Sequence, residues 1–222
     1  MEGCHGQRRI TKRARLRTKT ETSKVITMSQ TVAQSQEIML FQKWSFKDIT
    51  VKDIGLQRYL NLTPMVEPHS MGRHEHQRFR KAKVNIVERL INGLMRGGRN
   101  AGKKAKATNF IKEAFEIIHI KTGKNPVEVL VQAVENCAPC EDTTRVSYGG
   151  VVYHLSVDVA PQRRIDLAIR HITDGARMAS INNPKSIQET VADELMLAAV
   201  KDIKSAGVAK RNEIERVAQS SR

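Results

Sequence analysis

Residues 143–165 have the sequence TTRVSYGGVVYHLSVDVAPQRRI and interrupt a chain whose apolar residues otherwise recur at helical spacing. Within this stretch, side chains alternate with the period of a β-strand on both sides of Gly149-Gly150. Both glycines can adopt the positive φ that a two-residue hairpin loop requires. Pro161 is expected to end the second strand, because proline cannot donate to a sheet ladder. The sequence therefore predicts a β-ribbon over residues 143–160, packed at its base and with its tip available to a partner.

Helical patterns lie on both sides of this ribbon. Before it, apolar residues recur every three or four positions from Lys83, after Asn100 and after Asn125-Pro126. After it, the same spacing runs over residues 163–177, over residues 187–203 behind a capping box, and over a short last helix at residues 213–218. Gly207 is expected to stop the helix that precedes it. The predicted fold class is mainly α, a helical domain of about six helices with one β-hairpin ribbon inserted between the third and fourth core helices.

Three parts of the chain differ in composition. Residues 1–36 form a basic N-terminal extension that we expect to be disordered, and residues 37–82 form an N-terminal segment that precedes the core. Residues 83–222 are predicted to be the helical core domain that carries the ribbon.

Composition narrows the class of protein. The chain has 222 residues, a formal net charge of +15, 40% hydrophobic residues and 4% aromatic residues. No unbroken apolar run reaches about 18 residues, so we expect no transmembrane helix. Three cysteines do not make a disulfide framework. The surplus of positive charge calls for a polyanion, and the usual polyanions are nucleic acid and an anionic membrane surface. Of these two, we expect nucleic acid as the partner and no membrane.

The positive charge is concentrated in two stretches. Residues 1–36 hold eight Lys and Arg against two acids, and residues 70–112 hold twelve against Glu75 and Glu88, whereas the rest of the chain is close to neutral. A solvated charged face usually has interspersed acids, so the second stretch favours contact with phosphates. Because aromatic residues are scarce, we expect a protein that recognises RNA shape and backbone more than stacked bases. The predicted RNA-binding residues are Arg73, Arg78, Arg80, Lys81, Lys83, Arg96, Arg99, Lys103, Lys104, Lys106, Lys112, Arg163, Arg164 and Arg170.

The first basic stretch admits three interpretations. It is rich in Arg, Ser and Thr, which is typical of a disordered arm along phosphates and also of a mitochondrial transit peptide. Alternatively, Met28 is the working start and the preceding residues are a dispensable extension. The residues assigned to the arm are Arg8, Arg9, Lys12, Arg13, Arg15 and Arg17.

Cys137 and Cys140 have the spacing of a redox dithiol or of half a zinc site. A redox motif should follow a strand and open a helix, whereas this pair lies at a predicted helix end, and no second ligand pair completes a zinc site. Two ordinary thiols are the third interpretation. The glycines at 97, 98 and 102 lack the spacing of a phosphate-binding loop. We therefore expect no cofactor, no bound metal and no catalytic residue.

The sequence resembles the family of eukaryotic small-subunit ribosomal protein five, the counterpart of bacterial small-subunit protein seven. The resemblance covers residues 37–222, and the eukaryotic-type segment at 37–82 is part of it. The matching stretches are Leu40-Phe-Gln-Lys-Trp44-Ser, Arg78-Phe-Arg80-Lys81-Ala, Ile86-Val-Glu-Arg89-Leu, residues 109–123 with Ala114-Phe115-Glu116-Ile117-Ile118, Asn125-Pro126, residues 157–164, Ala192-Asp193-Glu194-Leu195 and residues 213–218.

The resemblance implies a structural constituent of the small ribosomal subunit that binds 18S rRNA in the 3′ major domain of the head and organises head assembly. It places the protein in the cytoplasmic 40S subunit, with assembly that begins in the nucleus or nucleolus. It also implies neighbouring ribosomal proteins, mRNA and exit-site tRNA as partners, with translation initiation factors as further candidates. The residues that it places near mRNA and tRNA are Arg145, Tyr148, Gly149, Gly150, His154, Lys210, Arg211, Arg216 and Arg222.

Two departures and two alternatives accompany the resemblance. The family often has more arginine near the ribbon tip, whereas Tyr148 and His154 stand here, so stacking or hydrogen bonds would replace charge pairs. Cys137 and Cys140 are not a family signature.

Two other functions are alternatives to a ribosomal protein. One is a helix-turn-helix DNA-binding regulator, which would share the basic helical composition, and the other is an enzyme that uses the cysteine pair.

Overall fold

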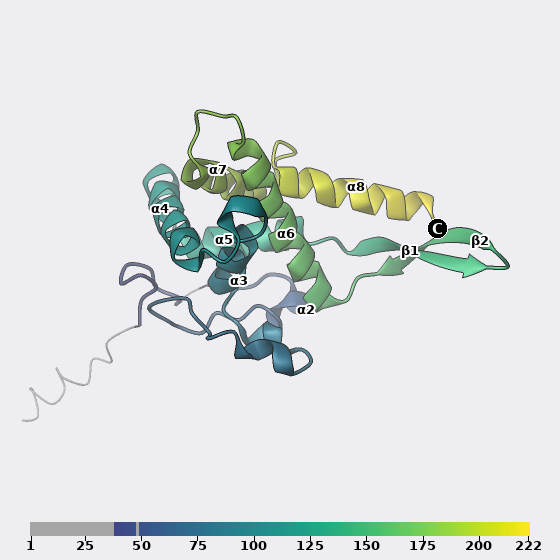
Figure 1. Ribbon diagram of the computed structural model, residues 1–222, viewed down its shortest axis with the longest axis horizontal. Helices are drawn as coiled ribbons and strands as arrows, with labels where there is room; N and C mark the ends of the chain where they lie inside the picture. Colours follow the sequence, from purple (N-terminus) through teal and green to yellow (C-terminus); the bar gives the residue numbers. More distant parts are fainter. Residues whose placement is uncertain (1–37, 48) are drawn as a thin grey trace, which may run out of the picture. The chain divides into compact units, whose positions relative to one another are not determined.

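The computed structural model describes residues 38–47 and 49–222, apart from the side chains of Arg73, Glu75 and Arg99. The predicted arm at residues 1–36 lies outside the described residues. In chain order the elements are α2 (Ile54–Gln57), 3-10 turns at Arg73–His76 and Arg80–Lys83, α3 (Ile86–Leu94), a 3-10 turn at Gly98–Asn100, α4 (Lys104–Thr122), α5 (Pro126–Cys137), β1 (Glu141–Tyr148), β2 (Val151–Asp158), α6 (Pro161–Ser180), α7 (Ile187–Val200) and α8 (Ala206–Ser220) (Figure 1). The mainly α fold with one hairpin between the third and fourth core helices, α5 and α6, is confirmed.

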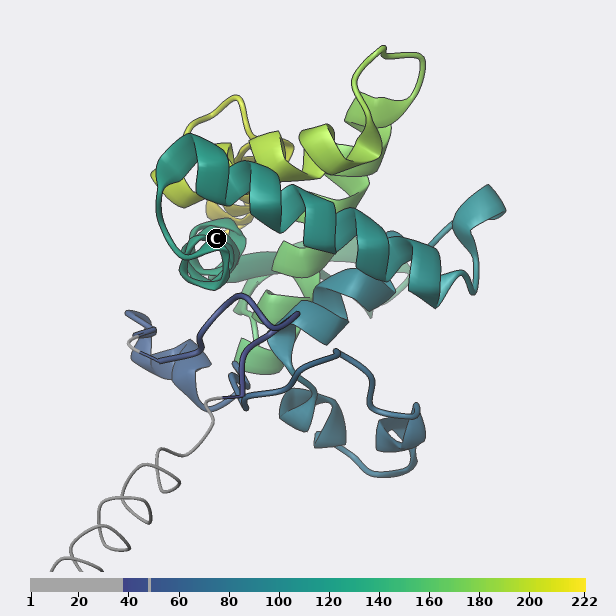
Figure 2. The same cartoon turned by 90° about the vertical axis from the view of Figure 1, so that its left-hand side faces the viewer.

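The described helices share one apolar core. Helix α7 contacts α4, α5 and α6, and Figure 2 shows α4 and α7 side by side. Phe115, Leu130 and Ile165 are fully buried in this core. The segment that precedes α3 joins it, because Leu40 and Leu56 are also fully buried there.

Helix starts follow local capping chemistry. The side chain of Asn85 accepts a hydrogen bond from the backbone N–H of Val87, so α3 begins at Ile86 rather than at Lys83 as the apolar spacing predicted. Asn125 caps α5 in the same way, with Pro126 in the first turn as expected. Pro161 also begins a helix: β2 already ends at Asp158, and the proline that we expected to end a strand lies in the first turn of α6.

The C-terminal boundaries predicted from the sequence are wrong. Helix α7 ends at Val200, because Lys201 has a left-handed backbone with φ 64°, and Ile203 is 74% exposed rather than buried. Gly207 does not stop a helix but lies buried in the first turn of α8, where a Cβ would come within 2.7 Å of the Cys137 Sγ. Ser205 caps this turn, so the helix expected over six residues has fifteen.

The ribbon is regular over its whole length. Glu141 pairs with Asp158 at the base and Tyr148 with Val151 at the tip, and Gly149 and Gly150 have the positive φ values predicted for the turn, 58° and 84°. Both strands contact α8 near the base. In Figure 1 the tip extends beyond the end of α8, so the outer half of the ribbon projects from the helical body.

Candidate nucleic-acid interface

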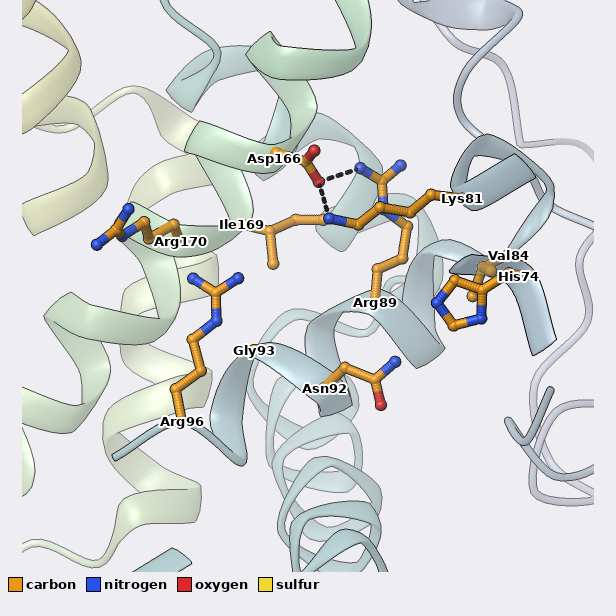
Figure 3. Close-up of a pocket in the computed structure, with 10 residues that line it drawn as sticks. All are labelled: His74, Lys81, Val84, Arg89, Asn92, Gly93, Arg96, Asp166, Ile169 and Arg170. Atoms are coloured by element: carbon orange, nitrogen blue, oxygen red, sulfur yellow. Dashed lines mark hydrogen bonds and ion pairs between the residues drawn. The ribbon is translucent and has the colours of Figure 1, made fainter. Parts of the chain in front are cut away.

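A basic groove lies between α3 and α6. The two helices approach closely at Gly93, where a Cβ would lie 2.9 Å from Thr173 Cγ2. Beside this crossing is a cavity of about 180 Å³. Its lining includes His74, Lys81, Arg89, Arg96, Asp166 and Arg170 (Figure 3). The groove therefore brings together Lys81, which precedes α3, and Arg96, which follows it.

Asp166 neutralises part of this groove. Its Oδ1 lies 2.9 Å from Lys81 Nζ and 2.7 Å from the nearly buried guanidinium of Arg89. Burial acts to raise the pKa of Asp166, but the hydrogen bonds from Lys81 and Arg89 outweigh it and hold the pKa below its ordinary value. Asp166 thus stays ionised at neutral pH and fixes these two cations within the protein.

Two other arginines of the groove remain available. Among the described residues, Arg96 is exposed and forms no ion pair, and Arg170 pairs only with Asp174, at 3.7 Å. Figure 3 shows both on the same side of the cavity, away from the Asp166 pairs. Arg96 and Arg170 are therefore the arginines of the groove whose charge is least neutralised within the described part of the protein.

Several other predicted rRNA contacts are used inside the fold. Lys104 Nζ lies 2.6 Å from the buried carboxylate of Glu88, and Arg164 lies 3.0 Å from Asp53 with only 14% of its side chain exposed. Arg163 contacts Asp142 at 3.4 Å and is largely exposed. Lys104 and Arg164 in particular have much of their charge satisfied within the protein.

The remaining predicted cations whose side chains the structure describes are exposed and have no ion pair with any described residue. Lys106 lies 5.5 Å from the centre of the Phe110 ring, a cation–π contact that leaves its charge unneutralised. The side chains of Arg73 and Arg99 are not among those described. The exposed and unpaired cations are Arg78, Arg80, Lys83, Arg96, Lys103, Lys106 and Lys112.

The pleat of the ribbon divides its predicted contacts between two faces. Arg145 is paired with His154 on a polar face, whereas Tyr148 lies on the opposite face with Val146 and Tyr153. These apolar side chains are between 42% and 81% exposed. The ribbon therefore offers a charged face and an apolar face, and the predicted contact residues do not form one cluster.

Most of the predicted contact residues on α8 and at the C-terminus form ion pairs with acids. Lys210 pairs with Glu213 at 2.7 Å, and Arg211 pairs with Glu215 at 3.2 Å. Arg222 pairs with Glu141 at the ribbon base. Arg216 is exposed and has no ion pair among the described residues, so it is the cation of α8 most available to a partner.

The two thiols have different environments. Cys137 is buried, and burial, with Glu194 nearby, raises its pKa to about 12, so the thiol stays protonated at neutral pH. Cys140 is exposed and its Sγ lies 3.4 Å from a nitrogen of Arg164.

Across residues 38–47 and 49–222, no group of three His, Cys, Asp or Glu side chains is placed to hold a metal ion. In the same part of the chain, no helix has the length and apolar character needed to cross a membrane.

Sequence reasoning missed the acids that organise this interface. Asp166 and Glu88 lie far along the chain from most of the cations that they bind, and helical periodicity does not single them out. One signal was available for Glu88. An isolated acid within a strongly basic stretch is a candidate internal ion-pair partner.

Comparison with known proteins gives consistent matches. The family described as "Ribosomal protein S7p/S5e" matches residues 56–222. The small ribosomal subunit protein uS7 of Cenarchaeum symbiosum is 52% identical over 199 residues, which cover 86% of this chain and 100% of that protein. The uS7 protein of Methanosphaera stadtmanae is 52% identical over 182 residues, 82% of this chain and 97% of its own length. That of Methanothermobacter thermautotrophicus is 50% identical over 183 residues, 82% of this chain and 98% of its own length.

Proposed function

Because this chain belongs to the ribosomal protein S7p/S5e family, whose members are structural and non-enzymatic components of the small ribosomal subunit, we propose that it binds small-subunit rRNA in the subunit head. In this role it organises head assembly by holding a junction of RNA helices. Family membership sets aside the enzyme and the DNA-binding regulator that the sequence left open.

The observation that carries the proposal is the distribution of unpaired cations. Arg78, Arg80 and Lys83 lie before α3, and Arg96 and Lys103 lie beyond its other end. Each is exposed and forms no ion pair with a described residue, so each can neutralise a phosphate without first breaking an internal contact. Release of counterions from the phosphates then favours binding and makes it strongly dependent on salt.

The ribbon and α8 have a second role in the proposal. Arg145 and His154 on the polar face of the ribbon, with Arg216 on α8, lie near mRNA in its exit channel and near exit-site tRNA. Neighbouring ribosomal proteins and translation initiation factors are the remaining proposed partners. Support comes from the projection of the ribbon beyond the helical body, which gives it reach toward a partner that the core does not contact (Figure 1).

The eukaryotic branch of the family stays a prediction. The relatives compared above are archaeal, and they support the family as a whole. Three assignments depend on that branch: the rRNA as 18S, the particle as 40S and the start of assembly in the nucleolus. The rRNA-binding chemistry is the same in either branch, because phosphates are common to both.

Salt dependence of binding tests the main proposal. Replacing both Arg78 and Arg80 by Gln should lower the slope of log K against log salt by about 1.4 to 1.8 for an rRNA head fragment, because two phosphate contacts are lost. The matched control replaces Lys121 and Lys185 by Gln; both lysines are paired with Asp193, so the slope should not change. Equal slopes for the two double variants would contradict the proposed footprint.

Shortening the ribbon tests the second role. Removal of residues around Gly149 and Gly150 leaves the core intact, because the outer ribbon is exposed on both faces. We expect normal folding and normal head assembly, with altered reading-frame or start-site fidelity in a reconstituted translation assay. Defective assembly with normal fidelity would refute the division of labour between core and ribbon.

A further inference from the structure

Phe79 occupies an unusual position for a large apolar residue. It is 66% exposed, whereas Phe115 is fully buried and Phe46 nearly so. Its backbone is left-handed with φ 60°, a conformation that is unfavourable for a bulky side chain. The core of the protein does not explain this placement, because most of the ring lies in solvent.

A second pocket opens beside this ring. Its volume is about 750 Å³, and its lining includes Arg58, Tyr59, Leu60, Phe79 and Lys83. Leu60 is buried beneath it, while Arg58 and Lys83 are exposed. The pocket thus combines an apolar floor, an aromatic ring and two cations.

Hydrogen bonds hold the walls of the pocket together. The Asn61 side chain donates to the Lys83 carbonyl, and the backbone N–H of Ile86 donates to the Asn61 carbonyl at 3.1 Å. Asn85 Nδ2 donates to the Thr63 carbonyl at 2.8 Å. Because these bonds join the two segments that line the pocket, its shape exists before a ligand arrives, and less ordering is required on binding.

The charge around Phe79 selects the class of ligand. Arg78 and Arg80 flank it, are exposed and have no ion pair with a described residue. Residues 76–87 contain no Asp or Glu. An apolar protein surface would gain from the ring but not from four surrounding cations, whereas a nucleotide gains from both, since its base stacks on an aromatic face and its phosphates meet the cations.

We propose that the Phe79 ring stacks on an unpaired rRNA base that enters the pocket between residues 58–63 and 79–83. Arg78, Arg80 and Lys83 hold the phosphates on either side of that base. The inference rests on the proposed rRNA binding, and it adds a base-stacking site to an interface otherwise built on backbone charge.

The test measures binding of the full chain to an rRNA head fragment over a series of salt concentrations. Phe79→Ala should weaken binding about 5- to 140-fold, the range found for loss of one base–aromatic stack. The slope of log K against log salt should not change, because no phosphate contact is removed. Phe79→Trp should restore binding, since the larger ring also stacks.

Two further variants separate stacking from loop structure. Met71 is also exposed and left-handed, with φ 56°, so Met71→Ala is the matched control and should bind like the unmodified chain. Phe79→Gly relieves the backbone strain, so it should unfold at the same temperature or higher while binding as weakly as Phe79→Ala.

The outcomes distinguish the two proposals. Wild-type affinity for Phe79→Ala, with the salt slope of the unmodified chain intact, would overturn the stacking site and leave rRNA binding standing. A changed slope in Phe79→Ala would show that the ring only positions the arginines, which also overturns it. Weakened incorporation into subunit particles without weaker binding to naked RNA would assign the ring to a protein neighbour. No binding by the unmodified chain would refute the proposed function itself.

Discussion

Replacing Lys104 by Met should destabilise the protein strongly, although Lys104 lies among cations predicted to bind RNA. Its Nζ lies 2.6 Å from Glu88 Oε1, and the Glu88 side chain is 1% exposed. Ser70 donates to the same oxygen through its backbone N–H at 2.9 Å and its hydroxyl at 2.8 Å. Loss of Lys104 would leave a buried carboxylate with two neutral donors and no counter-charge.

The expected cost follows from this burial. Removing one partner of a buried ion pair costs about 3–5 kcal/mol. Lys104 is 24% exposed and Ser70 keeps its two hydrogen bonds, so water and hydroxyl replace part of the lost interaction, and we expect about 2–3 kcal/mol. With a urea m value of about 2 kcal/mol/M, the unfolding midpoint should fall by about 1–1.5 M at an unchanged m value.

The neighbouring lysine is the matched control. Lys103 is exposed, forms no ion pair with a described residue and lies at the positive end of the α4 dipole. Lys103→Met should therefore leave stability within about 0.5 kcal/mol and should lower the salt slope of rRNA binding. The double variant Glu88→Gln, Lys104→Met has no unpaired carboxylate at position 88. It should therefore regain at least half of the free energy of unfolding that Lys104→Met loses. Equal midpoints for Lys103→Met and Lys104→Met would refute the reasoning.

The pH dependence gives an independent check on Glu88. Burial acts to raise its pKa, but the hydrogen bonds from Lys104 and Ser70 outweigh burial and lower the pKa below the ordinary 4.5. The ionised pair thus stabilises the protein fully above about pH 4.5, and this stabilisation is lost as pH falls through the lowered pKa. In Lys104→Met burial dominates, so its stability deficit should be greatest at neutral pH and should shrink on acidification. A deficit that is independent of pH would contradict this assignment.

Three further predictions concern other parts of the structure. Iodoacetamide at pH 8 should label Cys140 and leave Cys137 unlabelled until urea unfolds the chain, because burial raises the pKa of Cys137 to about 12. Peptide mapping measures this labelling, and rapid labelling of Cys137 in the native protein would contradict the prediction. Gly175→Ala should lower the free energy of unfolding by about 1–3 kcal/mol, although alanine has the better helix propensity, because a Cβ at position 175 would lie 2.6 Å from the Ala206 Cβ. An unchanged urea midpoint would show that α6 and α8 can move apart with little loss of free energy. Gly150→Ala should raise hydrogen exchange in the outer ribbon while the global unfolding temperature stays the same, because φ is 84° in an exposed turn; a lower unfolding temperature would mean that the ribbon supports the core.

The secondary structure was largely predictable because its signals are local. Helical spacing and the Asn125-Pro126 start located α5, and two glycines between alternating residues located the ribbon turn. The start of α8 was missed for a tertiary reason. Glycine often ends a helix, so Gly207 was expected to stop one. In the structure Gly207 instead allows α8 to pack closely against Cys137, and no residue near Gly207 in the sequence indicates this contact.

The candidate interface was predictable only as a stretch of chain. A count of charges treats Lys103 and Lys104 alike, yet one is exposed without an ion pair to a described residue and the other is paired with a buried acid. The same count treats Arg164 as an RNA contact, although Asp53 takes up much of its charge. The Phe79 site was missed because a single aromatic residue in a basic stretch carries no periodicity, and only its exposure and its pocket distinguish it.

The order of helices and ribbon, the family resemblance and the location of the basic stretch depend on residues close together in the chain, so the sequence predicts them. Which cations are available to RNA depends instead on ion pairs between residues that are far apart in the chain and meet only in the folded protein. Arg89 pairs with Asp166, 77 positions away in the sequence, and Lys104 pairs with Glu88, 16 positions away. Such pairs form because burying a lone charge is costly, so the fold brings an opposite charge to it from wherever the chain allows. The cations that remain unpaired are the ones that the protein can offer to phosphate.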